Sequence, residues 1–482
     1  MGKKNKVLEE LLQKSKDDKN HFLNTYSERI INGEASLFLG SGVSRNSGYP
    51  SWSELLRPCF EELGLDIKLS TDLYSVAQYY ANRHSDAELR RRFSEEINQS
   101  STDNDLLERL LEISYSSIWT TNYDKLIEQS LKRQFVGYNA ISNDKTLPSI
   151  SKGTRVNIYK MNGDISDPAN MVITKRDYEQ YTSKHPLFLA YLKKELVANT
   201  FLFAGYSFAD SQVLDCLNSL NQFLGDSGNC HYALMLVGEE VTRETQYFYE
   251  DLHRRYNIKC LPLKMEEMTN FISRISKKVR EKKVFISGAY DTIPEAETQF
   301  ADTLCRSLVH ELYGKRYRIA TGVGKQLGTL ITGYAHQYLA ERSTSDPSRQ
   351  LSMRPFPFHL NLDEDQKVRY RSIMMADCSA AIFMFGQSRS TSEAGGVAAT
   401  GHCSQGVYME YQLAKKAGLA IIPVGCTGYE AEIIWKEVSD NINEFYYLSK
   451  KIDKLRNEKN PEKLSKLILS ILDDIPKKHR ID

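Results

Sequence analysis

The chain of 482 residues carries 63 Lys and Arg against 62 Asp and Glu, for a formal net charge of +1. This balance gives no overall attraction to nucleic acid or acidic surfaces. The length predicts two domains rather than one core, and a 41% hydrophobic composition is ordinary for a globular protein. The sequence contains no run of about 18 apolar residues, so that no membrane span is predicted. The basic N-terminus does not resemble a secretory signal. We therefore expect a cytoplasmic protein.

Eight cysteines are present, and no two of them form a Cys-x-x-Cys pair. Their spacing predicts neither a zinc ribbon nor a thioredoxin-type site. Several lie in apolar runs, such as Cys378 before Ser-Ala-Ala-Ile-Phe, where a cysteine is typically a small buried side chain. We expect reduced thiols and no metal.

The first half of the chain alternates between predicted helices and short apolar strands. A helix is expected up to about residue 30, and others in SWSELLRPCFEELG, LYSVAQYYANRH, DAELRRRFSEEI and DLLERLLEI. Strands are predicted in EASLFLG, at 117–121, 156–161 and 199–204, and around 232–238. This alternation is typical of a doubly wound parallel sheet.

A basic stretch from about residue 262 to 283, ending SRISKKVREKK, marks the expected domain boundary. We interpret it as a solvated helix that joins two domains. A second α/β pattern follows, with strands at 284–286 and in YRIATGVG, CSAAIFMFG and LAIIPVG, and a closing helix in the last thirty residues. The predicted fold is α/β, with two Rossmann-like doubly wound parallel-sheet domains and extra helices, over residues 1–275 and 283–482.

Polar segments follow four of the predicted strands of the first half: GSGVS at 40–44, TTNYD at 120–124, NGD at 162–164 and AGYSFAD at 204–210. The carboxyl ends of parallel strands meet at one edge of a sheet, where doubly wound folds bind ligands. A single Gly-x-Gly is often only a tight turn, but glycines before a helix N-terminus also admit a phosphate. The four segments together predict a nucleotide site.

In order and spacing these segments resemble the sirtuin family, in particular its bacterial sirtuin-like NADases, over about residues 30–265. Sirtuins carry a Gly-Ala-Gly-x-Ser loop, a Thr-x-Asn-x-Asp segment, a His-Gly pair and a Gly-x-Ser motif, which correspond here to 40–44, 120–124, 162–163 and 205–207. The chain lacks the four-cysteine zinc module of the protein deacetylases, and Trp52 stands where those enzymes have an Asp-Phe-Arg run. The resemblance therefore implies NAD+ itself as the substrate, hydrolysed by water.

The resemblance also implies residue roles. Asn122 holds the nicotinamide ribose or the attacking water, the loop at 40–44 receives the pyrophosphate, and the segment at 205–210 lies near the adenosine half. Alternatively, Asn122 is only a helix N-cap, because Asn-x-x-Lys opens an apparent helix. The implied catalytic residues are Asn122, Asn162 and Asp124. The implied NAD+-binding residues are Gly40, Ser41, Gly42, Ser44, Trp52, Thr121, Asn122, Asp124, Gly205, Ser207 and Asp210.

Asn162 occupies the position of the sirtuin histidine that acts as general base. A carboxamide orients a hydroxyl but does not take its proton near neutral pH. We therefore expect NAD+ to bind while turnover falls by about 10²–10⁴-fold. His185 lies outside any motif, and Asp124 and Asp164 are nearer candidates for a replacement base. Locally, Asn-Gly is also a common turn dipeptide.

Residues 283–482 contain a second set of glycine-rich strand ends, in FISGAY, ATGVGKQLG, FMFGQSRS and QGVYMEYQLAKKAG. TGVGKQLG is not a P-loop, because no Gly-x4-Gly-Lys-Ser/Thr frame fits it. This half resembles the SLOG family of nucleotide-sensing Rossmann-like domains. A sirtuin-like domain followed by a SLOG domain is the arrangement of the anti-phage NADases of Thoeris defence systems, and the resemblance covers nearly the whole chain.

That resemblance implies an allosteric site for a cyclic ADP-ribose isomer made by a TIR-domain partner, together with homo-tetramers and filaments. Guanidinium groups would meet phosphates, and Glu410 would accept from ribose hydroxyls. Alternatively, Arg371 and Arg389 are ordinary surface residues, and Glu410 only interacts with a helix dipole. The candidate contacts are Ser287, Gly288, Gly322, Gly324, Arg371, Arg389, Gly406 and Glu410.

The sequence also leaves three other functions to consider. A non-catalytic nucleotide-sensing assembly protein is favoured by the missing base at Asn162. A protein deacylase would need the absent zinc module. A phosphoribohydrolase in the second half would need a Pro-Gly-Gly-x-Gly-Thr-x-x-Glu motif, which EAGGVAATGHC at 393–403 approaches only superficially.

Overall fold

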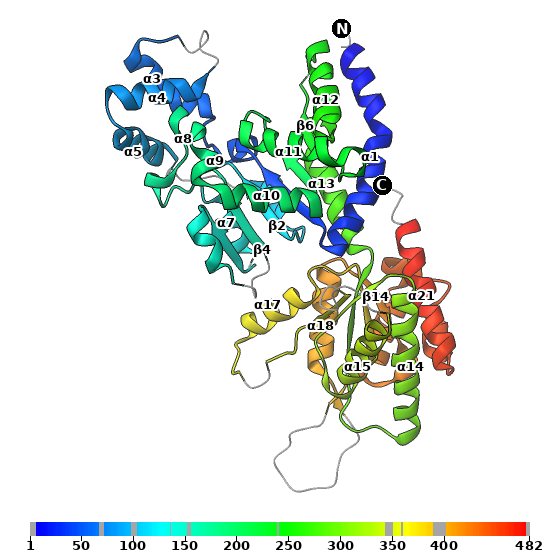
Figure 1. The fold of residues 1–482 in the computed structure, drawn as a ribbon. Coiled ribbons are helices and arrows are strands. Elements are labelled where there is room, and N and C mark those ends of the chain that lie inside the picture. Colours follow the sequence, from blue (N-terminus) through cyan, green and yellow to red (C-terminus); the bar gives the residue numbers. More distant parts are fainter. Residues whose placement is uncertain are drawn as a thin grey trace. The chain divides into compact units, whose positions relative to one another are not determined.

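The computed structural model describes residues 6–66, 72–97, 104–134, 136–151, 156–238, 241–342, 350–357, 360–388 and 402–478. The chain divides into two compact units, Met1–Lys278 and Val279–Asp482. Each unit has helices packed around its own sheet (Figure 1). Within the described residues, no helix is both long and apolar enough to cross a membrane.

The first unit contains a seven-stranded parallel sheet in the order β3-β4-β2-β1-β5-β6-β7. Its strands are β1 (Ala35–Leu39), β2 (Ser117–Thr120), β3 (Tyr138–Ile141), β4 (Val156–Lys160), β5 (Thr200–Ala204), β6 (His231–Leu236) and β7 (Ile258–Leu263). The central strands β1, β2 and β5 are buried along their whole length, as expected where helices cover both faces of a parallel sheet. The doubly wound fold predicted from the alternation is confirmed, while β3 and β7 were not predicted.

The order of the strands decides which loops meet. β4, β2, β1 and β5 are four adjacent strands, and the four polar segments of the sequence follow these same strands. All four segments therefore lie side by side at the carboxyl ends of these strands. Strand β1 is at their centre, with β2 on one side of it and β5 on the other. This is the topological switch point at which doubly wound sheets bind ligands.

Helices surround this sheet. They are α1 (Lys6–Asn32), α2 (Ser41–Ser44), α3 (Trp52–Leu63), α4 (Leu73–Arg83), α5 (Asp86–Ile97), α6 (Asp105–Leu111), α7 (Leu126–Arg133), α8 (Lys175–Glu179), α9 (Tyr181–Lys184), α10 (Pro186–Ala198), α11 (Ser211–Leu224), α12 (Arg243–Tyr256) and α13 (Met265–Arg280). Figure 1 shows α3, α4 and α5 as a helical lobe at one end of the unit. The lobe has its own apolar core, which includes Leu56, Tyr80 and Phe93 and reaches Tyr123 in the loop after β2.

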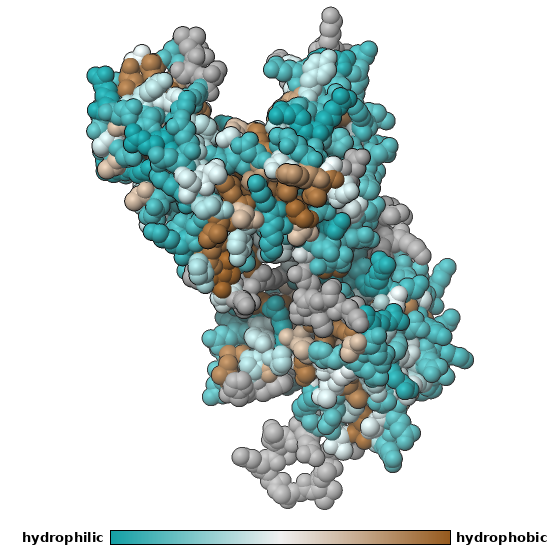
Figure 2. Space-filling view, viewed as in Figure 1, coloured by the Kyte–Doolittle hydropathy of each residue, from teal (hydrophilic) through white to brown (hydrophobic). Residues whose placement is uncertain are grey.

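The surface of the first unit is mostly polar, but Figure 2 shows apolar residues gathered over α10 and α11. The large exposed apolar side chains of these two helices include Leu187, Val197 and Phe223, and Phe223 is 85% exposed.

The second unit has a five-stranded parallel sheet in the order β10-β9-β8-β11-β14 and a small antiparallel pair, β12 and β13. Its strands are β8 (Lys283–Ala289), β9 (Arg318–Thr321), β10 (Leu351–Met353), β11 (Ala380–Phe385), β12 (Gln387–Ser388), β13 (His402–Cys403) and β14 (Ala420–Pro423). Its helices are α14 (Glu295–Gly314), α15 (Lys325–Glu341), α17 (Glu364–Met375), α18 (Gln405–Lys416), α19 (Tyr429–Asp440), α20 (Ile452–Asn457) and α21 (Pro461–Lys478). Its Rossmann-like parallel sheet was predicted, although β10 was not.

Candidate active site

A cavity lies at the switch point of the first unit, between the loops that follow β1, β2, β4 and β5 and the helical lobe. The residues predicted to bind or act on NAD+ that line it are Ser41, Ser44, Trp52, Thr121, Asn122, Asp124, Asn162, Ser207 and Asp210. The structure thus brings together residues from four strand ends, of which the first and last, Ser41 and Asp210, are 169 positions apart in the chain. Gly40, Gly42 and Gly205 do not line this cavity but support it from behind.

These three glycines let two loops pack against each other. The amide of Gly42 donates to the carbonyl of Gly205 at 2.9 Å, and the amide of Gly40 donates to that of Ala204 at 3.0 Å. A Cβ atom at Gly205 would lie 2.5 Å from the amide nitrogen of Val43, and Gly205 has a φ of +62°. The amides of Gly40 and Gly42 are therefore used within the protein, so that a phosphate in this loop would have to meet other groups, such as the Ser41 hydroxyl at the rim.

Asn122 and Asp124 are linked through one serine hydroxyl. The amide nitrogen Nδ2 of Asn122 donates to Ser44 Oγ at 2.9 Å, and Ser44 Oγ donates to Asp124 Oδ2 at 2.8 Å. Asp124 Oδ1 also accepts from the amide of Leu126 at 3.0 Å. The alternative that Asn122 is a helix N-cap is wrong, because α7 begins at Leu126 and Lys125 holds the cap position. The Asn122 side chain instead turns to the cavity.

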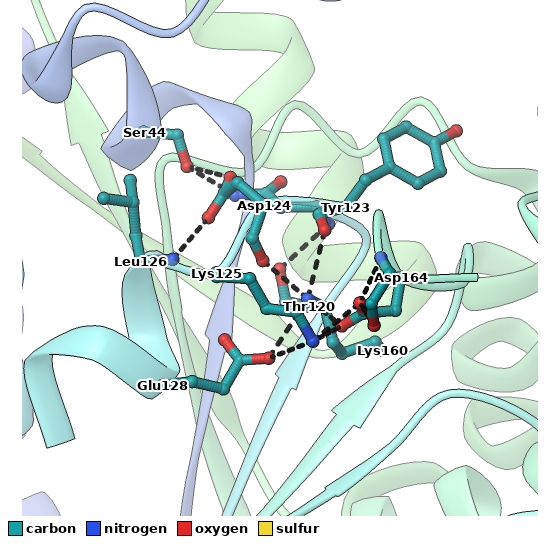
Figure 3. A network of polar contacts seen from close by, with 11 residues as sticks. Ser44, Thr120, Tyr123, Asp124, Lys125, Leu126, Glu128, Lys160 and Asp164 are labelled. Atoms are coloured by element: carbon teal, nitrogen blue, oxygen red, sulfur yellow. Dashed lines mark hydrogen bonds and ion pairs between the residues drawn. The ribbon is translucent and has the colours of Figure 1, made fainter. Parts of the chain in front are cut away.

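A buried lysine holds the floor beneath these loops (Figure 3). Lys160, whose side chain is 1% exposed, donates to the carbonyl oxygens of Tyr123 and Asp124 and to the carboxylates of Glu128 and Asp164. The two carbonyls belong to the loop after β2, and Asp164 belongs to the loop after β4. One ammonium group therefore fixes two of the four segments relative to each other.

Asp164 does not have the properties of a replacement base. Burial raises its pKa, but Lys160 and Lys125 outweigh burial and hold the pKa at about 2. A carboxylate with so low a pKa is a weak proton acceptor. Among the described residues, neither Asp164 nor His185 lines the cavity, and the His185 ring faces Asp144 at 3.7 Å.

Asn162 lies at the cavity wall and is 6% exposed. Its Nδ2 donates to the hydroxyl of Tyr178 at 3.1 Å, and its main-chain carbonyl oxygen accepts from the main-chain amide of Val172 at 2.8 Å. Gly163 has a φ of +92°, so the Asn-Gly pair does form a turn. The same turn presents the Asn162 side chain to the site.

Tyrosines complete the wall, and these the sequence did not indicate. Tyr74 of the lobe, Tyr178 of α8 and Tyr206 all line the cavity, and the rings of Tyr74 and Tyr178 lie 3.9 Å apart between centroids. Of these three tyrosines, only Tyr206 could have been found from the sequence, because it lies within the Gly205-Tyr206-Ser207 motif. Within the described residues, Trp52 Nε1 is a buried donor without a hydrogen-bond acceptor, so that it is available to a ligand.

The predicted allosteric residues of the second unit also gather, around Glu410. Ser287 at the end of β8 donates to Glu410 Oε2 at 2.6 Å, and Arg371 Nε lies 3.7 Å from Glu410 Oε1. A Cβ atom at Gly406 would lie 3.2 Å from the guanidinium of Arg371, and one at Gly322 would lie 3.9 Å from Glu410 Oε1. Gly288 and Gly324 pack backbone to backbone beside them. Arg389 lies outside the described residues.

Two alternatives for this cluster are wrong. Arg371 is not an ordinary surface residue, because its side chain is 8% exposed and its guanidinium lies over the Phe356 ring at 3.9 Å. Glu410 does not interact with the dipole at the N-terminus of α18, because it lies beyond the first turn of that helix. The first turn itself contains no acidic residue. Burial raises the pKa of Glu410 to about 7 against the opposing effects of Ser287 and Arg371.

Comparison with known proteins accounts for both units. A model of the SIR2-like domain matches residues 116–261, and a model of the Sir2- and TIR-associating SLOG family matches residues 267–475. The chain is 31% identical to the NAD(+) hydrolase ThsA of Bacillus cereus (strain MSX-D12), over 92% of this chain and 94% of that protein. It is 30% identical to the NAD(+) hydrolase ThsA of Enterococcus faecium, over 95% and 99% of the two chains. A shorter match, 25% identical over 47% of this chain, is with defense-associated sirtuin 2 of Bacillus subtilis. The chain belongs to the ThsA family, in which it combines a SIR2-like domain with a SLOG domain.

Proposed function

We propose that the first unit hydrolyses NAD+, the activity that the names of its relatives state for those proteins, and that the products are nicotinamide and ADP-ribose. The observation that carries this proposal is the convergence of Asn122, Asn162 and Asp210 from separate strand ends on one cavity. Trp52 and Tyr123, whose rings are stacked 6.1 Å apart, offer an apolar wall for a flat base. The Ser44 hydroxyl fixes the Asn122 amide beside the place where a ribose would lie.

We further propose that Asn162 makes this chain slow. Its side chain donates to Tyr178 and carries no basic nitrogen, so it orients a ribose hydroxyl or water without taking a proton. Loss of a general base costs about 10²–10⁴-fold in rate. NAD+ binding does not depend on that base and is expected to persist.

The second unit is proposed to be the switch. The buried pair of Arg371 and Glu410 suits a ligand with phosphates and ribose hydroxyls, because Arg371 Nε has no hydrogen-bond acceptor among the described residues. A cyclic ADP-ribose isomer made by a TIR-domain protein has this chemistry, and the family description names an association with TIR domains. Its binding would activate NAD+ depletion in infected cells, in a homo-tetramer that extends into filaments. Such a switch requires two states with different affinities for the ligand.

The alternative is a non-catalytic nucleotide sensor, which the amide at Asn162 favours. Equilibrium dialysis of NAD+ against the full chain in the presence of cyclic ADP-ribose isomers, with nicotinamide measured in the same samples, separates the two. Hydrolysis is supported if NAD+ binds and nicotinamide accumulates slowly with time and enzyme concentration. Binding without any nicotinamide, in this chain and in Asn162→His, would favour the sensor. Absence of NAD+ binding would refute the site itself.

A further inference from the structure

Asp210 stands at a helix N-terminus but does not cap it. It is the N-cap residue of α11, where an aspartate normally accepts a hydrogen bond from an amide of the first turn, yet its side chain makes no such bond. The carboxyl group lines the cavity instead, and the residue is 8% exposed. Asp210 therefore faces a ligand site without the hydrogen bond to a helix amide that an N-cap aspartate normally makes, and helix capping does not explain its position.

Its neighbours connect it to Asn162. The Tyr178 hydroxyl donates to Asp210 Oδ1 at 3.5 Å and accepts from Asn162 Nδ2 at 3.1 Å. Tyr74 and Tyr206 lie against the same carboxyl group across the cavity wall. Asp210 is therefore linked to Asn162, the position at which sirtuins have their base, both through the Tyr178 hydroxyl and by a hydrogen bond from Asn162 itself.

The Asp210 carboxyl group has no ion-pair partner among the described residues, because none of their Lys, Arg or His side chains lies within ion-pair distance of it. The charged groups on the neighbouring helices α5 and α8, Arg90 and Asp177, pair with each other at 3.0 Å. Burial raises the pKa of Asp210, although hydrogen bonds from Tyr206, Asn162, Tyr178 and Tyr74 oppose the rise. A raised pKa makes a carboxylate a better proton acceptor.

We propose that Asp210 accepts the proton released when water attacks the ribose of NAD+, in place of the base that Asn162 does not supply. The inference rests on the proposed hydrolysis of NAD+. In this step the bond between nicotinamide N1 and ribose C1′ breaks, and its electron pair leaves with nicotinamide. The water oxygen bonds to C1′, and the water proton passes to the Asp210 carboxylate, which later releases it to solvent.

The other acidic residues near the site fit this step less well. Asp124 is bound by Ser44 and by the amide of Leu126, and Asp164 is bound by two lysines. Asp210 alone of the three combines a place in the cavity wall with burial and freedom from a cation or an amide cap. Tyr178 is then a positioning residue, which holds the carboxyl group relative to Asn162.

The test compares full-length Asp210→Asn with Asp215→Asn. Asp215 is exposed on the same helix α11, so that its substitution removes one charge from that helix without touching the cavity. Initial rates of nicotinamide release are measured from pH 4.5 to 9 at saturating NAD+ and at a saturating concentration of the cyclic ADP-ribose isomer that is the proposed activator, and NAD+ binding is measured in parallel by dialysis. The same substitutions are made in an Asn162→His background, and Tyr178→Phe is added as a probe of positioning.

We expect slow turnover in the native chain that falls as the pH falls through the raised pKa of Asp210, because only the carboxylate accepts a proton. Asp210→Asn should lower this turnover at least about 10²-fold and flatten its pH profile, with NAD+ binding retained. Asp215→Asn should leave rate and profile unchanged. Tyr178→Phe removes a hydrogen bond that favours the ionised form, and should move the profile to higher pH. In Asn162→His the imidazole takes the proton, so that Asp210→Asn should cost less than about tenfold.

Three results overturn the inference. Equal rates for Asp210→Asn and the native chain would leave NAD+ hydrolysis standing but remove Asp210 from it. No turnover in the native chain at any pH, with turnover in Asn162→His, would mean that the lost base has no replacement. Failure of the native chain to bind NAD+ would refute the proposed function itself, and the inference with it.

Discussion

The buried ammonium of Lys160 offers a quantitative test of how the site is held together. Its side chain is 1% exposed and donates to two carboxylates and two loop carbonyls at 2.5–3.2 Å. Lys160→Met keeps the bulk but leaves both carbonyls without their cation and leaves Glu128 with only the more distant ammonium of Lys125, at 3.7 Å. Removing one partner of a buried ionic group typically costs 3–5 kcal/mol. The pKa of Asp164 is lowered from 3.8 to about 2 by Lys160, Lys125 and Ser166 together, against the effect of burial. At about 1.4 kcal/mol per pKa unit this is roughly 2.5 kcal/mol, of which Lys160 supplies only a part.

We therefore expect Lys160→Met to lower the free energy of unfolding of the first unit by about 3–5 kcal/mol. The matched control is Lys125→Met, which removes a 34% exposed lysine from the same Asp164 and should cost less than about 1 kcal/mol. Urea titration with pulsed hydrogen–deuterium exchange reports each unit by its own peptides, and the second unit serves as an internal reference. A loss below about 1 kcal/mol for Lys160→Met would refute the view that this ammonium joins the loops.

Three further outcomes are expected. Gly205→Ala should destabilise the first unit by at least about 1–3 kcal/mol in urea titration, because the residue has a φ of +62° and its new methyl group would meet the backbone of Val43; wild-type stability would contradict the close packing of the two loops. The folded pKa of Glu410 is about 7 against an ordinary 4.5, so the folded second unit keeps a proton that the unfolded chain loses. Its stability should fall as the pH rises from 4.5 through 7, by up to roughly 3 kcal/mol, and Glu410→Gln should remove that slope. Arg371→Lys keeps the charge but loses the planar fork, and should weaken binding of a cyclic ADP-ribose isomer at least about tenfold by calorimetry; unchanged affinity would place the ligand elsewhere.

The sequence was sufficient to predict the strand ends that build the site. Each polar segment follows a short apolar run, and parallel strands bring such ends to one edge whatever their separation in the chain. The sequence alone therefore places Asn122, Asn162 and Asp210 at one site. The buried position of Lys160 was harder to predict, because a lysine at the end of a strand usually reaches solvent.

The residues that were missed come from elements whose position depends on packing. Tyr74 and Tyr178 reach the cavity from α4 and α8, and nothing in their local sequence marks a site. The N-cap interpretation of Asn122 failed because the chain needs three more residues before α7 can begin, and Asp124 supplies the hydrogen bond to Leu126 that a cap would give. Likewise, from the sequence alone an aspartate before α11 is expected to cap that helix. Only the structure shows that the Asp210 carboxyl group lines the cavity instead.

The central claim is a nucleotide-activated NAD+ hydrolase that Asn162 makes slow. The most direct measurement is nicotinamide release by full-length Asn162→His beside the native chain, each with and without cyclic ADP-ribose isomers. The account predicts rapid release from Asn162→His only when the cyclic nucleotide is present, and release slower by about 10²–10⁴-fold from the native chain under the same conditions. Equal rates of nicotinamide release from the two proteins would contradict the account. So would a rate for Asn162→His that is the same with and without the cyclic nucleotide.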